Sequence, residues 1–129
     1  MKKLIAIAAI LFAFTSATKA QSTFYASSVS DGSYNSYTGT YQWAAARSAH
    51  LRFTVSTSVI SIDNEAHSTF YLGTQTTNRV NNDGTHTYQW DATDQNNVGC
   101  RVKITVYRDG SELVCVFYSD VAAAYAIPE

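Results

Sequence analysis

The amino-acid sequence predicts an all-β domain of about eight antiparallel strands, arranged as a small barrel or a two-sheet sandwich. Two observations support this fold class. Ser, Thr, Tyr and Val dominate the chain after residue 20, and these residue types favour strands. Proline occurs only once, and no apolar stripe with helical spacing reaches a useful length.

The first twenty residues have the layout of a secretory signal peptide, which lies outside the fold. Lys2 and Lys3 give a basic start, residues 4–14 form an unbroken apolar run, and residues 18–20 provide a small-residue cleavage site. The apolar run is 11 residues long, whereas a helix needs about 20 to span a bilayer. We therefore expect residues 21–129 to be one exported domain, periplasmic or extracellular, with no membrane span.

The charge of the exported part argues against two classes of partner. Three of the nine basic residues lie in the first twenty positions, and all ten acidic residues lie after them, so the formal charge falls from −1 to −4. Nucleic-acid binding needs clustered Lys and Arg, and so does binding to an anionic membrane surface. We therefore expect neither a nucleic acid nor a membrane surface as partner.

Two four-residue sequences occur twice in the same order. Ser-Thr-Phe-Tyr occupies 22–25 and 68–71, and Thr-Tyr-Gln-Trp occupies 40–43 and 87–90. Self-similarity at a nearly constant offset indicates duplication, although convergence among common strand residues would also produce short matches. Duplication predicts pseudo-repeats at about 22–66 and 68–127, each with a Phe-Tyr strand, a Tyr-Gln-Trp strand and a hairpin.

The first hairpin follows from alternation. The segment 50–56 places its leucine, phenylalanine and valine on one face. A turn directly after it would put Val55 opposite Ile60 and Phe53 opposite Ile62. All four apolar side chains then share one face, so the register is self-consistent.

The second hairpin is predicted from an Asp-Gly turn. Strands at 100–107 and 112–119 flank Asp109-Gly110, which is a strong hairpin signal. A two-residue turn there would pair Cys115 with Ile104. Both faces of the second strand are apolar, so we expect it to be central, covered on both sides or part of an interface.

The remaining segments are expected to be loops and one closing strand. Residues 27–39 and 73–85 are rich in Ser, Thr, Asn and Gly, which favours loops, and Asn82-Asp83-Gly84 predicts a tight turn in the second. Residues 121–127 are predicted to be a last edge strand that closes the sheet, although their alanines also allow a helical turn.

The two cysteines allow two interpretations. A pair of cysteines in an exported chain suggests a disulfide. In the predicted hairpin register, however, the α-carbons of Cys100 and Cys115 would lie about 13 Å apart, whereas bonded cysteines need about 4.4–6.8 Å. This favours two buried reduced thiols, and a bond would require another register.

Motifs for catalysis or metal binding are absent from the sequence. The three histidines lack the spacing of zinc ligands, and the acidic segment 91–97 lacks the spacing of an EF-hand loop. We expect that segment to be a solvated turn, with calcium binding as its alternative. No serine-hydrolase elbow, phosphate loop or zincin signature occurs. We therefore predict no enzyme activity, cofactor or metal; a catalytic alternative would place Asp91 or Asp94 beside a histidine.

The aromatic residues are the remaining candidates for a site. Tyr41 and Trp43 share one face of their strand, and Tyr88 and Trp90 share one face of theirs. Core packing is one interpretation, because large rings dominate small cores. The other is an aromatic-lined pocket or surface, which suits sugars, small amphiphiles or a protein partner. We take these four as the candidate ligand-binding residues.

The C-terminal half resembles a group of small secreted β-rich proteins from Bacteroidota. The resemblance covers roughly residues 85–127 and is carried by Tyr88, Trp90, Asp94, Gly99-Cys100-Arg101-Val102, Tyr118-Ser119-Asp120 and Tyr125. This chain has a longer loop between Asp94 and Gly99. The group has no assigned activity, so the resemblance implies an exported β fold and nothing about chemistry.

The sequence therefore predicts an exported, non-enzymatic β-domain that binds a small ligand, a sugar or a small amphiphile, through its aromatic residues. The alternative is a protein-interaction or structural domain, such as an inhibitor or an assembly subunit. That alternative would expose an apolar strip, such as Val114, Val116 and Tyr118. The sequence indicates neither the identity of the partner nor the oligomeric state.

Overall fold

The computed structural model describes residues 22–56, 58–63 and 69–129. The predicted signal peptide at 1–20 lies outside these residues. The described part of the chain forms nine strands and no helix, which confirms the all-β fold class. The strands are β1 (Ser22–Asn35), β2 (Thr40–Trp43), β3 (Arg47–Ser56), β4 (Val59–Ile62), β5 (Thr69–Val80), β6 (His86–Asp94), β7 (Gly99–Val106), β8 (Glu112–Phe117) and β9 (Val121–Ile127).

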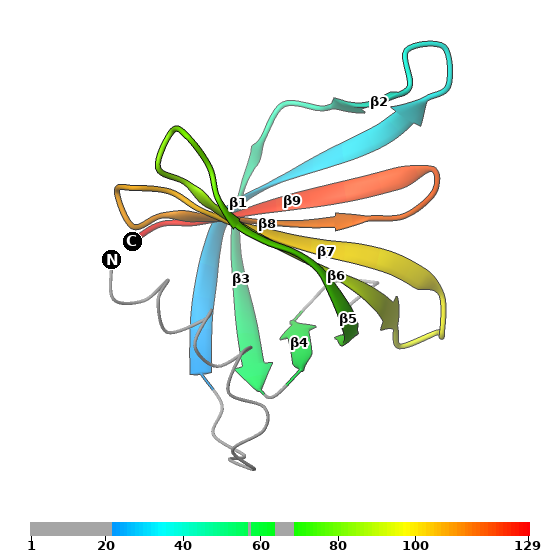
Figure 1. Ribbon diagram of the computed structural model, residues 1–129. Coiled ribbons are helices and arrows are strands. Elements are labelled where there is room, and N and C mark those ends of the chain that lie inside the picture. Colours follow the sequence, from blue (N-terminus) through cyan, green and yellow to red (C-terminus); the bar gives the residue numbers. More distant parts are fainter. Residues whose placement is uncertain (1–21, 57, 64–68) are drawn as a thin grey trace.

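The strands form a closed antiparallel barrel with one additional strand (Figure 1). The wall runs in the order β1-β3-β4-β5-β6-β7-β8-β9, and β9 returns to pair with β1. Of the two predicted architectures, the barrel is the correct one. The predicted closing strand is confirmed as β9, although it pairs on both sides and is no edge. β2 pairs with the C-terminal end of β1, and this hairpin projects from the barrel.

β1 is long because it serves two parts of the wall. Residues 22–29 pair with β3, and residues 28–33 pair with β9. A bulge between Ala26 and Ser28 marks the change of partner, and bulges bend strands where a barrel wall turns. The predicted loop at 27–39 is therefore wrong for most of its length. Pairing with a strand from the far end of the sequence overrides the loop-like composition.

Alternate residues of the strands fill the barrel interior. Phe53 and Phe70 are the largest fully buried side chains. The core also contains Phe24, Leu51, Val55, Ile60, Ile62, Tyr88, Trp90, Val102, Ile104, Val114, Val116, Tyr125 and Ile127. The strip predicted for a protein partner is thus wrong, because Val114 and Val116 are buried in the barrel and Tyr118 packs against the same core.

The first predicted hairpin is confirmed residue for residue. Val55 pairs with Ile60 and Phe53 with Ile62, and all four side chains are buried. Their strict alternation allows one register only, because any slip by one residue would expose them.

The predicted register of the second hairpin is wrong by one residue. Cys115 pairs with Lys103 and not with Ile104. The N–H of Gly110 donates to the carbonyl of Tyr107, and Gly110 has a φ of 94°. This is a three-residue loop with a bulged glycine, one residue longer than the predicted turn. Because both faces of the second strand are apolar, the hydrophobic pattern did not reveal the slip.

The slip places the two cysteines on opposite faces of the wall. Cys100 faces the barrel core, whereas Cys115 faces outward. Both are buried free thiols, as the thiol interpretation predicted. Burial raises the pKa of each thiol to about 11.

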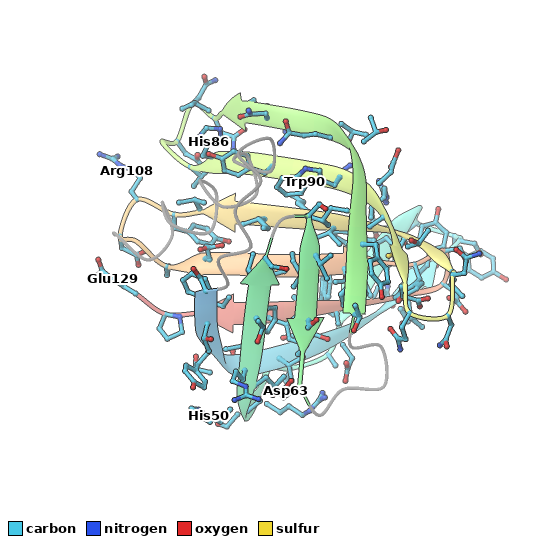
Figure 2. All side chains as sticks on the ribbon, turned by 90° about the horizontal axis from the view of Figure 1, so that it is seen from below. His50, Asp63, His86, Trp90, Arg108 and Glu129 are labelled. Atoms are coloured by element: carbon cyan, nitrogen blue, oxygen red, sulfur yellow. The ribbon has the colours of Figure 1, made fainter. Side chains whose placement is uncertain are left out.

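The β5–β6 and β7–β8 hairpins have matching loops at one end of the barrel. In each, the aspartate before the glycine accepts hydrogen bonds from the backbone N–H and the hydroxyl of the following Thr85 or Ser111. These bonds lower the pKa of Asp83 and Asp109. The first loop confirms the tight turn predicted at residues 82–84. The rest of the loop predicted at 73–85 is wrong, because β5 continues to Val80 and pairs there with β6. Figure 2 shows Arg108 and His86 at this end.

The two segments that share Thr-Tyr-Gln-Trp have partly different neighbours. β2 forms a hairpin with β1, and β6 forms a hairpin with β5. β6 also pairs with β7, whereas β3 pairs directly with β1 and, in the described chain, not with β2. The two halves thus share this hairpin and differ in the pairing of the next strand. Duplication stays a prediction.

Candidate functional site

Residues of the β1–β2 hairpin and of the outer face of β7, β8 and β9 line a groove of about 610 Å³. We call this the aromatic groove. Its walls are Tyr41, Trp43 and Phe117. Between them lie the small side chains of Ser30, Cys115 and Ala124, which we call the floor, and Leu113 and Lys103 also line the groove.

The turn of the hairpin is fixed by local hydrogen bonds. The side-chain Oδ1 of Asn35 accepts the N–H of Tyr37 at 2.9 Å, and the carbonyl of Asn35 accepts the N–H of Gly39 at 2.8 Å. Gly39 has a φ of 72°, a conformation that glycine adopts without strain. This turn returns β2 along β1, so Tyr41 lies opposite Tyr34.

A glycine allows Trp43 to lie flat against the hairpin. Trp43 pairs with Gly32 across the two strands. A β-carbon on Gly32 would lie 3.0 Å from two atoms of the indole ring, closer than carbon atoms normally approach. The absence of a side chain at this position therefore sets the place of the indole.

The aromatic rings contact one another in edge-to-face and tilted geometries. The Tyr41 ring centroid lies 5.1 Å from that of Phe117 and 5.3 Å from that of Tyr34, and the Trp43 centroid lies 6.1 Å from Phe117. Such arrangements are favourable for aromatic pairs. The guanidinium of Arg101 lies 5.5 Å from the Phe117 centroid, a cation–π distance. The rings of the cluster thus pack directly against one another.

The hairpin is also tied to the barrel by a polar contact. The hydroxyl of Tyr41 donates a hydrogen bond to the backbone carbonyl of Tyr118. This bond joins β2 to the turn between β8 and β9. It satisfies the tyrosine hydroxyl and leaves the ring facing the groove.

The floor of the groove receives no large side chain from β9, because the outward-facing residues of this strand are alanines. Ala122, Ala124 and Ala126 point outward there, opposite outward-facing residues of β8 and β1. Cys115 lies on the floor beside Lys103, and the positive charge of Lys103 partly offsets the effect of burial on the pKa of the thiol. Small floor residues between large rings create the space for a ligand.

The structure does not bring the four predicted aromatic residues together. Tyr41 and Trp43 line the aromatic groove, and Trp43 keeps 43% of its surface exposed. Tyr88 and Trp90 belong to the barrel core, and Trp90, which Figure 2 labels, is only 2% exposed. The two pairs therefore lie on different sides of the barrel wall.

Sequence reasoning missed Phe117 as a member of the site. The available signal was the second apolar face of its strand, which indicated a covered surface. The predicted pairing of Cys115 with Ile104 puts Phe117, two residues further along the strand, on the same face as Ile104, so its place beside Tyr41 was not expected.

The acidic segment 91–97 lies in a turn only from residue 95 onward, because residues 91–94 belong to β6, and Asp94 at the end of that strand is buried. Oδ1 of Asp94 accepts the backbone N–H groups of Asn96 and Val98 at 2.9 and 3.0 Å. Oδ2 accepts the hydroxyl of Tyr118. Asp94 is 2% exposed, so the expectation of a solvated turn is wrong for this residue.

The described residues contain no group of three or more His, Cys, Asp and Glu that could hold a metal ion. His50 stacks on Tyr25, and His86 stacks on Tyr88. His67 lies outside the described residues. In the described parts of the chain, no helix is both long and apolar enough to cross a membrane.

No protein-family model, curated protein or solved structure matches the chain. The aromatic groove is therefore interpreted from its own geometry.

Proposed function

We propose that the protein is an exported, non-enzymatic β-barrel that binds a small ligand, a sugar or a small amphiphile, in the aromatic groove. One observation carries this proposal. The half-exposed indole of Trp43 and the rings of Tyr41 and Phe117 border a groove of about 610 Å³ with a floor of small side chains. The volume falls within the range of about 300–1,000 Å³ that ligand pockets occupy.

The chemistry of the lining supports a ligand with an apolar face and polar edges. The rings offer flat apolar area on which a sugar ring or an alkyl chain can pack. Ser30 and Thr40 contribute hydroxyls, and Lys103 contributes a cation. A few polar groups among aromatic walls are typical of sites that orient a small ligand.

The exported location is part of the proposal and is supported by the sequence of residues 1–20. A basic start, a short apolar run and a small-residue cleavage site are the features of a secretory signal peptide. Outside the cytoplasm the protein would meet sugars and amphiphiles of the surroundings.

The exposed hairpin tip favours a second candidate function, binding to a protein. Tyr37 at the tip is 98% exposed, and Tyr34 beside it is 45% exposed. Exposed tyrosines near a tryptophan are typical of protein interfaces. In this candidate the hairpin itself would be the contact, rather than the groove behind it.

A ligand titration with matched variants tests the proposal. The exported protein is titrated with a panel of mono- and oligosaccharides and small alkyl amphiphiles, and binding is followed by tryptophan fluorescence and by NMR. Trp43→Ala is compared with Tyr71→Ala, which removes a ring of similar exposure outside the groove lining. We expect saturable binding of at least one compound that is lost in Trp43→Ala and retained in Tyr71→Ala.

Two outcomes count against the proposal. The first is the absence of saturable binding across the panel. The second is binding that both variants lose equally. Loss of binding to a protein partner in Tyr37→Ala, with no ligand found, would favour the second candidate.

A further inference from the structure

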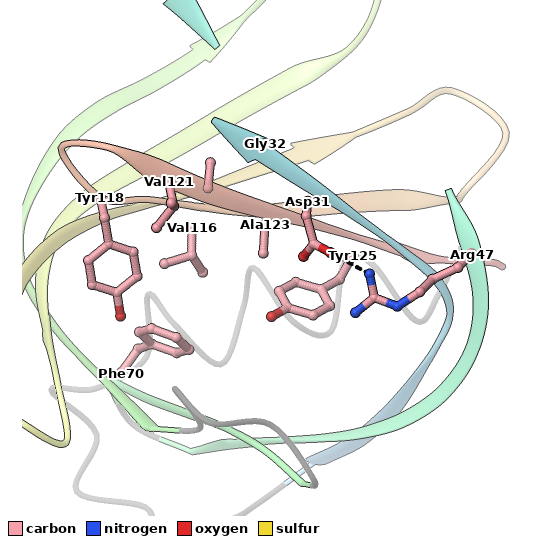
Figure 3. Close-up of a pocket in the computed structure, with 10 residues that line it drawn as sticks. Asp31, Gly32, Arg47, Phe70, Val116, Tyr118, Val121, Ala123 and Tyr125 are labelled. Atoms are coloured by element: carbon pink, nitrogen blue, oxygen red, sulfur yellow. Dashed lines mark hydrogen bonds and ion pairs between the residues drawn. The ribbon is translucent and has the colours of Figure 1, made fainter. Parts of the chain in front are cut away.

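A second cavity opens at the mouth of the barrel, on the other side of the wall from the aromatic groove (Figure 3). Adjacent residues of β8 and β9 face the two spaces. Val116 and Ala123 line the cavity, whereas Cys115 and Ala124 line the groove. We call this space the mouth cavity. Its volume is about 330 Å³.

The walls of the mouth cavity are mainly apolar. Phe70 and Tyr118 lie at one end, and Val116, Ala123 and the ring of Tyr125 follow along its length (Figure 3). A water molecule occupies about 30 Å³ in the liquid, so the cavity has room for roughly eleven groups of that size. This is the size of a short alkyl chain or a small ring system.

A charged pair lies at the other end of the mouth cavity. Nη1 of Arg47 donates to Oδ2 of Asp31 at 2.5 Å, and both side chains are more than half exposed. Figure 3 shows this pair beside Tyr125, away from Phe70. The pair with Asp31 uses one nitrogen of Arg47, and the planar guanidinium carries further N–H donors in a fork that matches a carboxylate.

From this arrangement we propose that the mouth cavity binds a small amphiphile with a carboxylate head and a short alkyl body. The alkyl body lies along Val116 and Ala123 toward Phe70, where it leaves water. The carboxylate takes the remaining donors of Arg47 at the rim, where it stays partly hydrated. This site is separate from the aromatic groove, and the proposal does not depend on ligand binding there.

Calorimetric titration with decanoate tests this site. We expect one decanoate to bind, and we expect Arg47→Gln to weaken the affinity at least about tenfold. Arg52→Gln is the matched control, because Arg52 is equally exposed and also ion-paired, with Asp63, but does not line the cavity. Decan-1-ol should bind more weakly than decanoate and should be insensitive to Arg47→Gln. Decanoate should also shift the NMR signals of the Val116 methyl groups.

Several results would overturn the proposal. Absence of saturable decanoate binding would do so, as would equal losses in Arg47→Gln and Arg52→Gln. Tighter binding of decylamine than of decanoate would place the head group on Asp31 instead. Binding that is lost in Trp43→Ala, with the Val116 signals unmoved, would place decanoate in the aromatic groove.

Discussion

The hydroxyl of Tyr118 donates a 2.8 Å hydrogen bond to the buried carboxylate of Asp94. The bond joins the turn between β8 and β9 to the turn between β6 and β7. The backbone carbonyl of Tyr118 accepts the hydroxyl of Tyr41, and its ring lines the mouth cavity. Tyr118 therefore connects the hairpin of the aromatic groove, the barrel mouth and the β6–β7 turn.

Removing this hydroxyl should destabilise the fold. Tyr118→Phe would leave Oδ2 of Asp94 without the hydroxyl that now bonds it in a buried position. A hydrogen bond to a charged group contributes about 1.5–3 kcal/mol, so we expect the free energy of unfolding to fall by about that amount. Urea unfolding followed by circular dichroism measures the change. Tyr107→Phe, which alters a more exposed tyrosine, is the control, and equal effects in both variants would contradict the assigned role.

The two tryptophans should differ sharply in access to solvent. Trp43 is 43% exposed in the groove wall, and Trp90 is 2% exposed in the core. Acrylamide should therefore quench the fluorescence of Trp43 and leave the fluorescence of Trp90 largely unquenched. Trp43→Phe should remove the quenchable part while the protein stays folded. A quenching curve that this variant does not change would show that the exposed indole is placed incorrectly.

Gly32 should be intolerant of a side chain. A β-carbon there would meet the indole of Trp43 at 3.0 Å, and overpacking of this kind typically costs about 1–3 kcal/mol. We expect Gly32→Ala to displace the indole, to lower stability by that amount and to raise the exposure of Trp43. Gly99→Ala serves as the control, because a β-carbon at Gly99 meets no atom within 4 Å. If both substitutions behave alike in thermal unfolding and acrylamide quenching, the contact is absent.

The buried thiols predict a loss of stability at alkaline pH. The ordinary thiol pKa of 9.0 is raised to about 11 for Cys100 and Cys115, mainly by burial. The folded state thus holds these protons more tightly than the unfolded state. The raised thiol pKa values therefore contribute fully to the free energy of unfolding below pH 9, and this contribution is lost as the pH rises toward 11. The raised pKa values of Tyr88, Tyr107 and Tyr118 act in the same direction.

Urea midpoints at pH 7, 9 and 10.5 measure this loss. We expect Cys115→Ala to show a smaller decrease between pH 9 and 10.5 than the unaltered protein. A midpoint that does not change over this range would contradict the burial of the thiols. Both thiols should also react slowly with iodoacetamide at pH 8 until the protein is unfolded, because the thiolate is the reactive form.

The sequence predicts the parts of the fold where side chains alternate strictly. The β3–β4 register follows from Phe53 and Val55, because only one pairing buries them with their isoleucine partners. The β7–β8 register does not follow in this way, since Leu113 and Val114 suit either face. There the loop decides, and a bulged glycine at Gly110 adds one residue that the Asp-Gly signal does not reveal.

Of the four predicted site residues, only Tyr41 and Trp43 line the aromatic groove, and the reason is similar. The same four residues, Thr-Tyr-Gln-Trp, form β2 outside the barrel and part of β6 within its wall. Local sequence is identical, so only the neighbouring strands decide whether the rings of Tyr41 and Tyr88 are in a groove or in the core. Those neighbours are set by long-range pairing, including that of β1 with β9.

Native mass spectrometry of the exported protein, residues 21–129, tests the central claim most directly. The protein is purified gently after export and measured beside Trp43→Ala. Ligand binding in the aromatic groove predicts an excess mass that disappears on denaturation and is strongly reduced in Trp43→Ala. The claim is contradicted if neither an excess mass nor the uptake of any compound from the sugar and amphiphile panel is reduced in Trp43→Ala.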